Sequence, residues 1–205
     1  MVPGFGGEHL SGGIQVSIEI FRKNMGSFTL SVAFGIAILA HVDARGWPLH
    51  DAVEDGDHAL VEKLLEKGAK LERTGGKGGH TPLHDAAFLG HTSIAALLID
   101  KGAALEAATW DGLTPLHLAA FAGHADAVTL LLDRGATLEA ESTQHRDTPL
   151  HRAAAGGVLG IVELLLDRGA SIKSDKYGYT PLHTAAAAGH AEVARLLIER
   201  GMRPC

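Results

Sequence analysis

The sequence predicts an all-α solenoid of stacked helix-turn-helix units, and two observations support this prediction. The stretch from Thr114 to Gly135, TPLHLAAFAGHADAVTLLLDRG, has four other copies of the same length in the chain. The copies recur with a period in the thirties, which is typical of repeat architectures. Because one such unit cannot bury its apolar side alone, it must stack on its neighbours. The other copies begin at Trp47, Thr81, Thr148 and Thr180.

The first half of each unit predicts a short helix. Thr114 can cap an unpaired backbone N–H, and Pro115 suits the first helical position because its missing donor costs nothing there. Leu116 and the alanines at 119–120 then share one helical face, where small side chains let a neighbouring helix approach closely. Gly123 follows and ends this helix.

The second half of each unit predicts another helix. Asp126 lies in its first turn, the leucines at 130–132 form part of a broad apolar stripe, and Gly135 follows its end. A basic residue precedes the final glycine of every unit, where a cation suits the helix macrodipole. These residues are Lys67, Lys101, Arg134, Arg168 and Arg200.

The repeated segments TPLHDAAFLGH, TPLHLAAFAGH and TPLHTAAAAGH, each followed by a leucine-rich helix, resemble ankyrin repeats. The resemblance covers residues 47–205 as five units. It implies paired helices in two layers, with a β-hairpin finger projecting from each loop between units. Three local departures stand out: the first unit begins with Trp47 instead of threonine, the fourth has GGV where the others have GH, and the loop 145–147 lacks a turn glycine.

The two ends of the array differ. Lys63 replaces the apolar residue that starts the leucine triplet in later units, as expected of a capping unit whose outer side meets water. The last unit keeps an apolar triplet at 196–198, so its outer side is predicted to be partly bare or covered by a partner.

Residues 1–46 do not fit the repeat and resemble a secretory signal peptide. Arg22 and Lys23 precede an uncharged apolar run at 28–40, and a small-x-small site follows that ends at Ala44. Cleavage near Ala44 would leave a mature protein that begins almost at the first unit. We therefore expect an exported protein, either periplasmic or secreted.

Two other interpretations of residues 1–46 stay open. The run 28–40 could be an uncleaved membrane anchor, although it is shorter than the roughly 20 residues that a spanning helix needs. It could also be an apolar helix that packs on the array of a cytoplasmic protein. Translation from Met25 would remove the basic residues from the segment.

Composition and motifs argue against catalysis and against several kinds of ligand. A net charge of -6 gives no basic surface for nucleic acid, and the single Cys205 cannot form an intrachain disulfide. The chain contains no metalloprotease, nucleophile-elbow or phosphate-loop motif, and the glycine-rich run 75–79 lacks the ending that binds phosphate. We therefore expect no enzyme activity, no cofactor and no metal.

Most of the thirteen histidines recur in register and favour a structural role. Packed helices lie about 8 to 10 Å apart, whereas ligands of one zinc ion lie about 2 Å from it. Equivalent histidines are thus too far apart to share an ion, and we expect them to be hydrogen-bonded within the loops. The recurrent acids at the ends of the second helices are interpreted as a solvated face.

Variation on this constant frame indicates where a partner protein binds. By resemblance to the family, the partner-facing surface consists of the finger tips and the exposed positions of each first helix, among them Asp85. Aromatic residues and arginine, the usual hot-spot residues, gather there. The predicted binding residues are Phe88, Leu89, Trp110, Asp111, Leu118, Phe121, His145, Arg146, Arg152, Tyr177 and Tyr179.

The sequence thus predicts a monomeric, non-enzymatic module that binds another protein. A scaffold that protects a co-localised enzyme is an alternative, and an enzyme accessory or hydrolase is the alternative with the least support, because no cleft of titratable groups is evident. Phe88 and Phe121 could also merely pack against an adjacent finger.

Overall fold

The computed structural model describes residues 48–75 and 78–201. The predicted signal peptide, with its apolar run at 28–40 and its cleavage site near Ala44, lies outside the described residues. None of the described helices combines the length and the apolar composition needed to cross a membrane.

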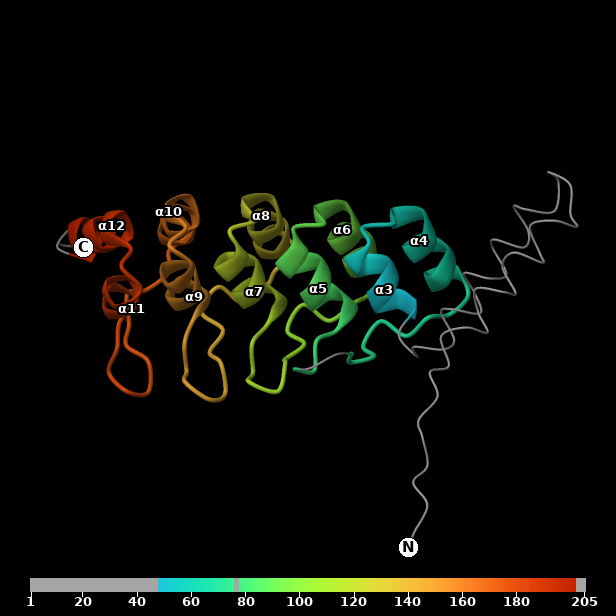
Figure 1. Cartoon of the computed structure of the whole chain (residues 1–205), viewed down its shortest axis with the longest axis horizontal. Helices are drawn as coiled ribbons and strands as arrows, with labels where there is room; N and C mark the ends of the chain where they lie inside the picture. Colours follow the sequence, from blue (N-terminus) through green and yellow to red (C-terminus); the bar gives the residue numbers. More distant parts are fainter. Residues whose placement is uncertain (1–47, 76–77, 202–205) are drawn as a thin grey trace, which may run out of the picture. The chain divides into compact units, whose positions relative to one another are not determined.

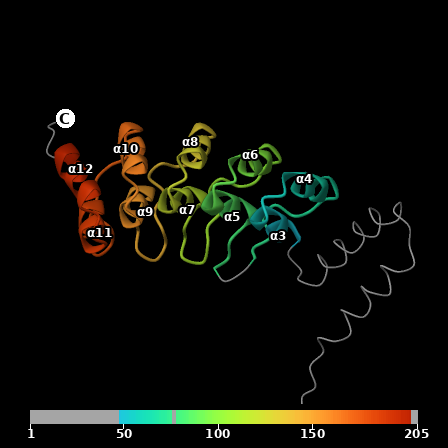
Figure 2. The ribbon, with the colours of Figure 1, turned by 45° about the horizontal axis from the view of Figure 1, so that its top comes forward.

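The described residues form ten helices in five antiparallel pairs, which stack side by side as two rows (Figures 1 and 2). Units 1 to 5 denote the repeats that begin at residues 47, 81, 114, 148 and 180. The inner row contains α3 (Pro48–Glu54), α5 (Pro82–Leu89), α7 (Pro115–Ala122), α9 (Pro149–Gly156) and α11 (Pro181–Ala187). The outer row contains α4 (His58–Glu66), α6 (Thr92–Asp100), α8 (Ala125–Asp133), α10 (Leu159–Asp167) and α12 (Ala191–Gly201). The prediction of an all-α repeat solenoid is confirmed.

Threonine and histidine together start the inner helices of units 2 to 5. Thr81 lies in extended conformation before Pro82, and its side chain accepts a hydrogen bond from the backbone N–H of His84. In return, His84 Nδ1 accepts a hydrogen bond from the Thr81 backbone N–H at 3.1 Å. The same capping box recurs at Thr114, Thr148 and Thr180. A histidine thus takes the part that glutamate or glutamine usually plays in such boxes.

Positive φ angles and close neighbours in the next unit favour glycine at the ends of α5, α7 and α9. Gly90 has φ of 74°, and a methyl group in place of its hydrogen would lie 2.5 Å from the ring of His124 in the next unit. Gly123 has φ of 88° and faces Val158 in the same way. The GGV departure of unit 4 therefore replaces one covering side chain by another and keeps the stacking.

Leucines and alanines fill the space between the two rows. Leu98, Leu116, Leu131 and Leu165 are fully buried, as are the paired alanines of α5, α7 and α9. Because the alanines are small, adjacent inner helices pack closely; truncating one of the leucines to alanine would cost about 2 to 5 kcal/mol. Lys63 at the first unit is exposed, as expected for a capping unit.

Four loops, here called fingers 1 to 4 (the described residues 69–75 with 78–80, then 103–113, 136–147 and 170–179), project from the array (Figure 1). The expected β-hairpins are not confirmed, because the described residues of the fingers contain one isolated bridge, between Gly75 and His80, and no named strand. Two backbone hydrogen bonds close each of the other tips, for example Asp175 N–H to the Tyr179 carbonyl at 2.8 Å and Gly178 N–H to the Asp175 carbonyl at 3.2 Å. In finger 3, Arg146 takes a positive φ of 59° where fingers 2 and 4 have Gly112 and Gly178.

Candidate interaction surface

The C-terminal ends of the inner helices carry a row of exposed apolar side chains. Phe88 and Phe121 occupy equivalent positions in adjacent helices and are 41% and 42% exposed. Leu89, next to Phe88, is also exposed. Farther along the row the equivalent positions hold Ala155 and Ala187. The bulky part of this face is therefore confined to α5 and α7, and the predicted exposure of the two phenylalanines is observed.

The helix position after the recurrent histidine is more covered than the sequence suggested. Leu118, predicted to face a partner, is buried with 7% exposure. Arg152, at the same position in unit 4, pairs with Asp147 at the end of finger 3 at 2.7 Å. Its Nε is buried and has no hydrogen-bond partner. This position faces the base of a finger, which explains why an apolar residue there is enclosed.

Asp85, the third residue at this position, joins two histidines that sequence reasoning did not connect. Its carboxylate lies 2.6 Å from His50 Nδ1 in unit 1 and 3.0 Å from His80 Nδ1 in finger 1. Burial would raise the pKa of Asp85, but the two histidines hold it below its ordinary value. The contacts link non-equivalent positions, so register alone could not reveal them.

The contacts of His50 favour a proton on both ring nitrogens. Its Nδ1 faces the Asp85 carboxylate and its Nε2 lies 2.8 Å from the Arg73 carbonyl oxygen, so both partners are acceptors. Burial opposes the charge, yet these two bonds, together with the charges of Asp85 and Glu54, raise the pKa of His50.

The equivalent histidines of units 2 to 4 are neutral links between units. His117 Nδ1 accepts from the Thr114 backbone N–H at 3.1 Å, so the proton lies on Nε2, which donates to the Asp147 carbonyl oxygen at 3.0 Å. Burial lowers the pKa of both His84 and His117 to about 4. The prediction that these histidines are hydrogen-bonded to the loops is confirmed. The described residues contain no cluster of three or more side chains suited to a metal ion.

A family model described as "Ankyrin repeats (3 copies)" matches residues 49–142 and again residues 137–205. The chain belongs to the ankyrin repeat family. A comparison with curated proteins found no match. Ankyrin repeats are generally protein–protein interaction modules, and the family is typically non-enzymatic.

Finger tips in this ankyrin array are joined to one another by backbone hydrogen bonds. The Trp110 N–H donates to the Gly78 carbonyl at 2.9 Å, and the Lys176 N–H donates to the His145 carbonyl at 3.0 Å. Asp111 accepts from the Gln144 side chain of the next finger. Each finger therefore supports the next one, which limits the conformational entropy lost when a ligand binds.

Trp110 is the most exposed large apolar side chain among the described residues, at 72%. One edge of its indole nevertheless rests on finger 1, since a methyl group at Gly79 would lie 2.6 Å from the ring. The sequence offered no packing explanation for this tryptophan, and the glycine supplies one. Its outer face remains open.

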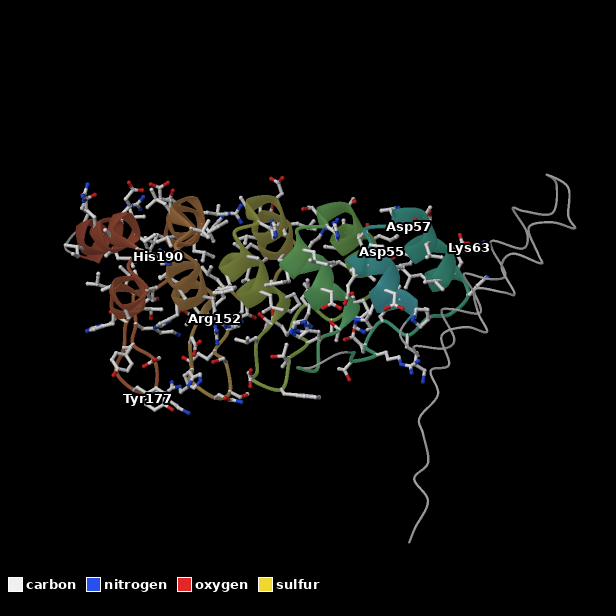
Figure 3. All side chains as sticks on the ribbon, viewed as in Figure 1. Asp55, Asp57, Lys63, Arg152, Tyr177 and His190 are labelled. Atoms are coloured by element: carbon white, nitrogen blue, oxygen red, sulfur yellow. The ribbon has the colours of Figure 1, made fainter. Side chains whose placement is uncertain are left out.

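Fingers 3 and 4 present the remaining predicted residues. Tyr177, labelled in Figure 3, is exposed at the tip of finger 4, with its ring 5.7 Å from that of His145. The Lys176 Nζ lies 5.0 Å from the centre of the same ring. Arg146 pairs with Glu141 at 2.7 Å, and the exposed Tyr179 meets His183 edge-on.

Two ladders of polar contacts run between the ankyrin units on the outer side. Arginine before the final glycine pairs with aspartate one unit earlier, in the pairs Asp100–Arg134, Asp133–Arg168 and Asp167–Arg200. The recurrent aspartates, interpreted as a solvated face, are indeed exposed but are tied between units. A second ladder joins finger bases: Glu72, Glu106 and Glu139 accept the backbone N–H groups of Ala104, Thr137 and Ser171. At the next equivalent position Lys173 replaces glutamate and pairs with Glu139.

Proposed function

We propose that the protein is a non-catalytic adaptor or inhibitor that holds a partner protein against the inner helices and the finger tips. The observation that carries this proposal is the placement of exposed large apolar side chains. Among the described residues these are Phe88, Leu89, Trp110, Phe121, Tyr177, Tyr179 and Ile198. All but Ile198 lie on the inner helices or the fingers. Isolated exposed apolar residues are ordinary on a surface, whereas their restriction to one set of elements is typical of a binding face.

The construction of the array supports the same function. Neutral histidines and buried leucines maintain the stack, and hydrogen bonds between neighbouring finger tips join the fingers to one another. A surface supported in this way loses little entropy on binding.

The experiment is a pull-down with the tagged full-length chain from its native host. The double substitution Trp110→Ala and Phe121→Ala should remove a co-purifying protein that the unmodified chain retains. Far-UV circular dichroism should stay unchanged, since neither side chain belongs to the buried core.

The control is Glu62→Ala with Glu163→Ala, which truncates two exposed side chains on the outer helices α4 and α10, away from the face. This variant should retain the partner. Equal capture by the double variant and the unmodified chain would remove Trp110 and Phe121 from the binding face.

A further inference from the structure

The inner row carries an uneven distribution of charge. On the inner helices and at their C-terminal ends, the ionisable side chains apart from histidine are Asp51, Glu54, Asp55, Asp85 and Arg152, of which Glu54 and Asp55 are exposed. Asp85 is engaged by His50 and His80, and Arg152 by Asp147. Within the described residues no salt bridge involves the other three. The charges left available to a ligand are therefore carboxylates of unit 1.

These carboxylates are in line with the apolar row. Glu54 occupies the same position in unit 1 as Phe88 and Phe121 in units 2 and 3, and Asp55 corresponds to Leu89. Both acids are exposed, and Figure 3 labels Asp55 near α3. Since adjacent helices lie about 8 to 10 Å apart, the row changes from acidic at α3 to aromatic at α7 over roughly 20 Å.

The other end of the row is flat. Ala155, Gly156, Ala187 and Ala188 occupy the equivalent positions of units 4 and 5. Side chains at these positions are absent or end at Cβ, so they present neither charge nor bulk. A ligand that matches the whole row needs a cation over unit 1 and apolar groups over units 2 and 3.

We propose that the partner binds this face through an amphipathic segment with lysine or arginine at one end and apolar side chains following it. The basic end lies over Glu54 and Asp55, and the apolar side chains contact Leu89 and the two phenylalanines. This inference rests on the proposed function and adds the chemistry and the direction of the bound segment. Complementary charge at one end fixes the orientation and speeds association, while the apolar contacts supply most of the affinity.

The test starts from a phage-displayed library of random twelve-residue peptides, selected on the immobilised full-length chain. Enriched peptides should carry lysine or arginine consistently toward one end and apolar residues toward the other. One enriched peptide is then synthesised with a fluorophore, and its affinity is measured by anisotropy at low salt.

Glu54→Gln together with Asp55→Asn should weaken this peptide about threefold to tenfold, because exposed ion pairs contribute modestly, and should reduce the salt dependence of binding. Glu62→Gln with Glu66→Gln removes two carboxylates from α4 in the same unit and is the matched control, expected to leave the affinity unchanged. Phe88→Ala with Phe121→Ala should weaken binding about tenfold or more.

Enrichment without a basic end, or an equal loss in the two carboxylate variants, would overturn the inference. If the enriched peptides then still lost affinity for the variant with Phe88→Ala and Phe121→Ala, the proposed binding face would stand, but the requirement for a basic end of the ligand would not. Peptides insensitive to both phenylalanines would instead count against the proposed function itself. A library that yields no enriched peptide would also overturn the inference, since a match to twelve residues is what the row predicts.

Discussion

The junction between units 1 and 2 differs from the junction between units 3 and 4 in how the recurrent histidine forms its hydrogen bonds. His50 and His117 occupy the same step of the repeat, yet His50 donates from both nitrogens and its pKa is raised, whereas His117 accepts at Nδ1 and its pKa falls to about 4. Nδ1 of His50 faces the Asp85 carboxylate of the next unit, whereas Nδ1 of His117 accepts the backbone N–H of Thr114 in its own unit. Both rings are buried, so the different partners of Nδ1 accompany pKa shifts in opposite directions.

Acid should separate the two kinds of junction most strongly. The folded-state pKa of His84 and His117 is about 4, below the ordinary 6.5, so their contribution is complete above pH 6.5 and is lost as the pH falls toward 4. The free energy of unfolding should drop by about 2 to 3 kcal/mol per histidine between pH 7 and pH 4.5. Urea unfolding at each pH measures this loss.

The stability of the junction between units 1 and 2 should change with pH in the opposite direction over part of that range. The raised pKa of His50 gives a contribution that is complete below 6.5 and is lost as the pH rises through the folded-state value. The lowered pKa of Asp85 gives a contribution to stability that is present above pH 3.8 and is lost in stronger acid. Hydrogen exchange should therefore show amides of α5 better protected relative to α7 at pH 5.5 than at pH 8. Uniform loss of protection would contradict the assigned charges.

Removing the ring of a middle histidine tests the neutral link directly. His117→Ala leaves the Thr114 N–H and the Asp147 carbonyl without their buried partner, and it should cost about 2 to 4 kcal/mol in chemical denaturation. His183→Ala is the control, because His183 is exposed in the last unit and caps only its own helix; about 1 kcal/mol or less is expected. Equal losses would mean that the link between units contributes nothing.

Asp85→Asn tests the charged junction. The substitution keeps the size of the side chain but removes the charge that faces His50 and His80, so it should cost about 1.5 to 3 kcal/mol at pH 6. The loss should shrink as the pH rises through the raised pKa of His50. Glu62→Gln, an exposed change of the same kind, should show neither effect, and a pH-independent loss would argue against an ionised pair.

The outer ion pairs should give the smallest change. Arg168→Gln breaks the pair with Asp133, which is exposed, and should cost about 0.5 kcal/mol or less. In 1 M salt the difference from the unmodified chain should vanish. A larger effect that survives salt would show that the ladder is more than a surface feature.

Sequence reasoning succeeded where residues recur in register. The period, the helix pairs, the terminal glycines and the hydrogen bonding of the recurrent histidines follow from the repeated letters, since equivalent residues meet equivalent neighbours. It failed where the partners are not equivalent. Asp85 meets His50 of the preceding unit, where the equivalent positions of units 3 and 4 hold Leu118 and Arg152, and Trp110 rests on Gly79 because that residue has no side chain. Leu118 was expected at the surface by resemblance to the family, whereas it is buried, and Asp85 and Arg152 at the same position pair with residues at the ends of fingers 1 and 3.

Lys173 has a consequence for how this array could lengthen by gene duplication. A copied unit inserted between units 2 and 4 would donate its finger N–H to a glutamate of the preceding unit. Its own glutamate would accept the finger N–H of the following unit. A copy appended after unit 5 would meet an ammonium group, which has no lone pair to accept that amide. A single side chain at the base of finger 4 therefore favours growth from within over growth at the end.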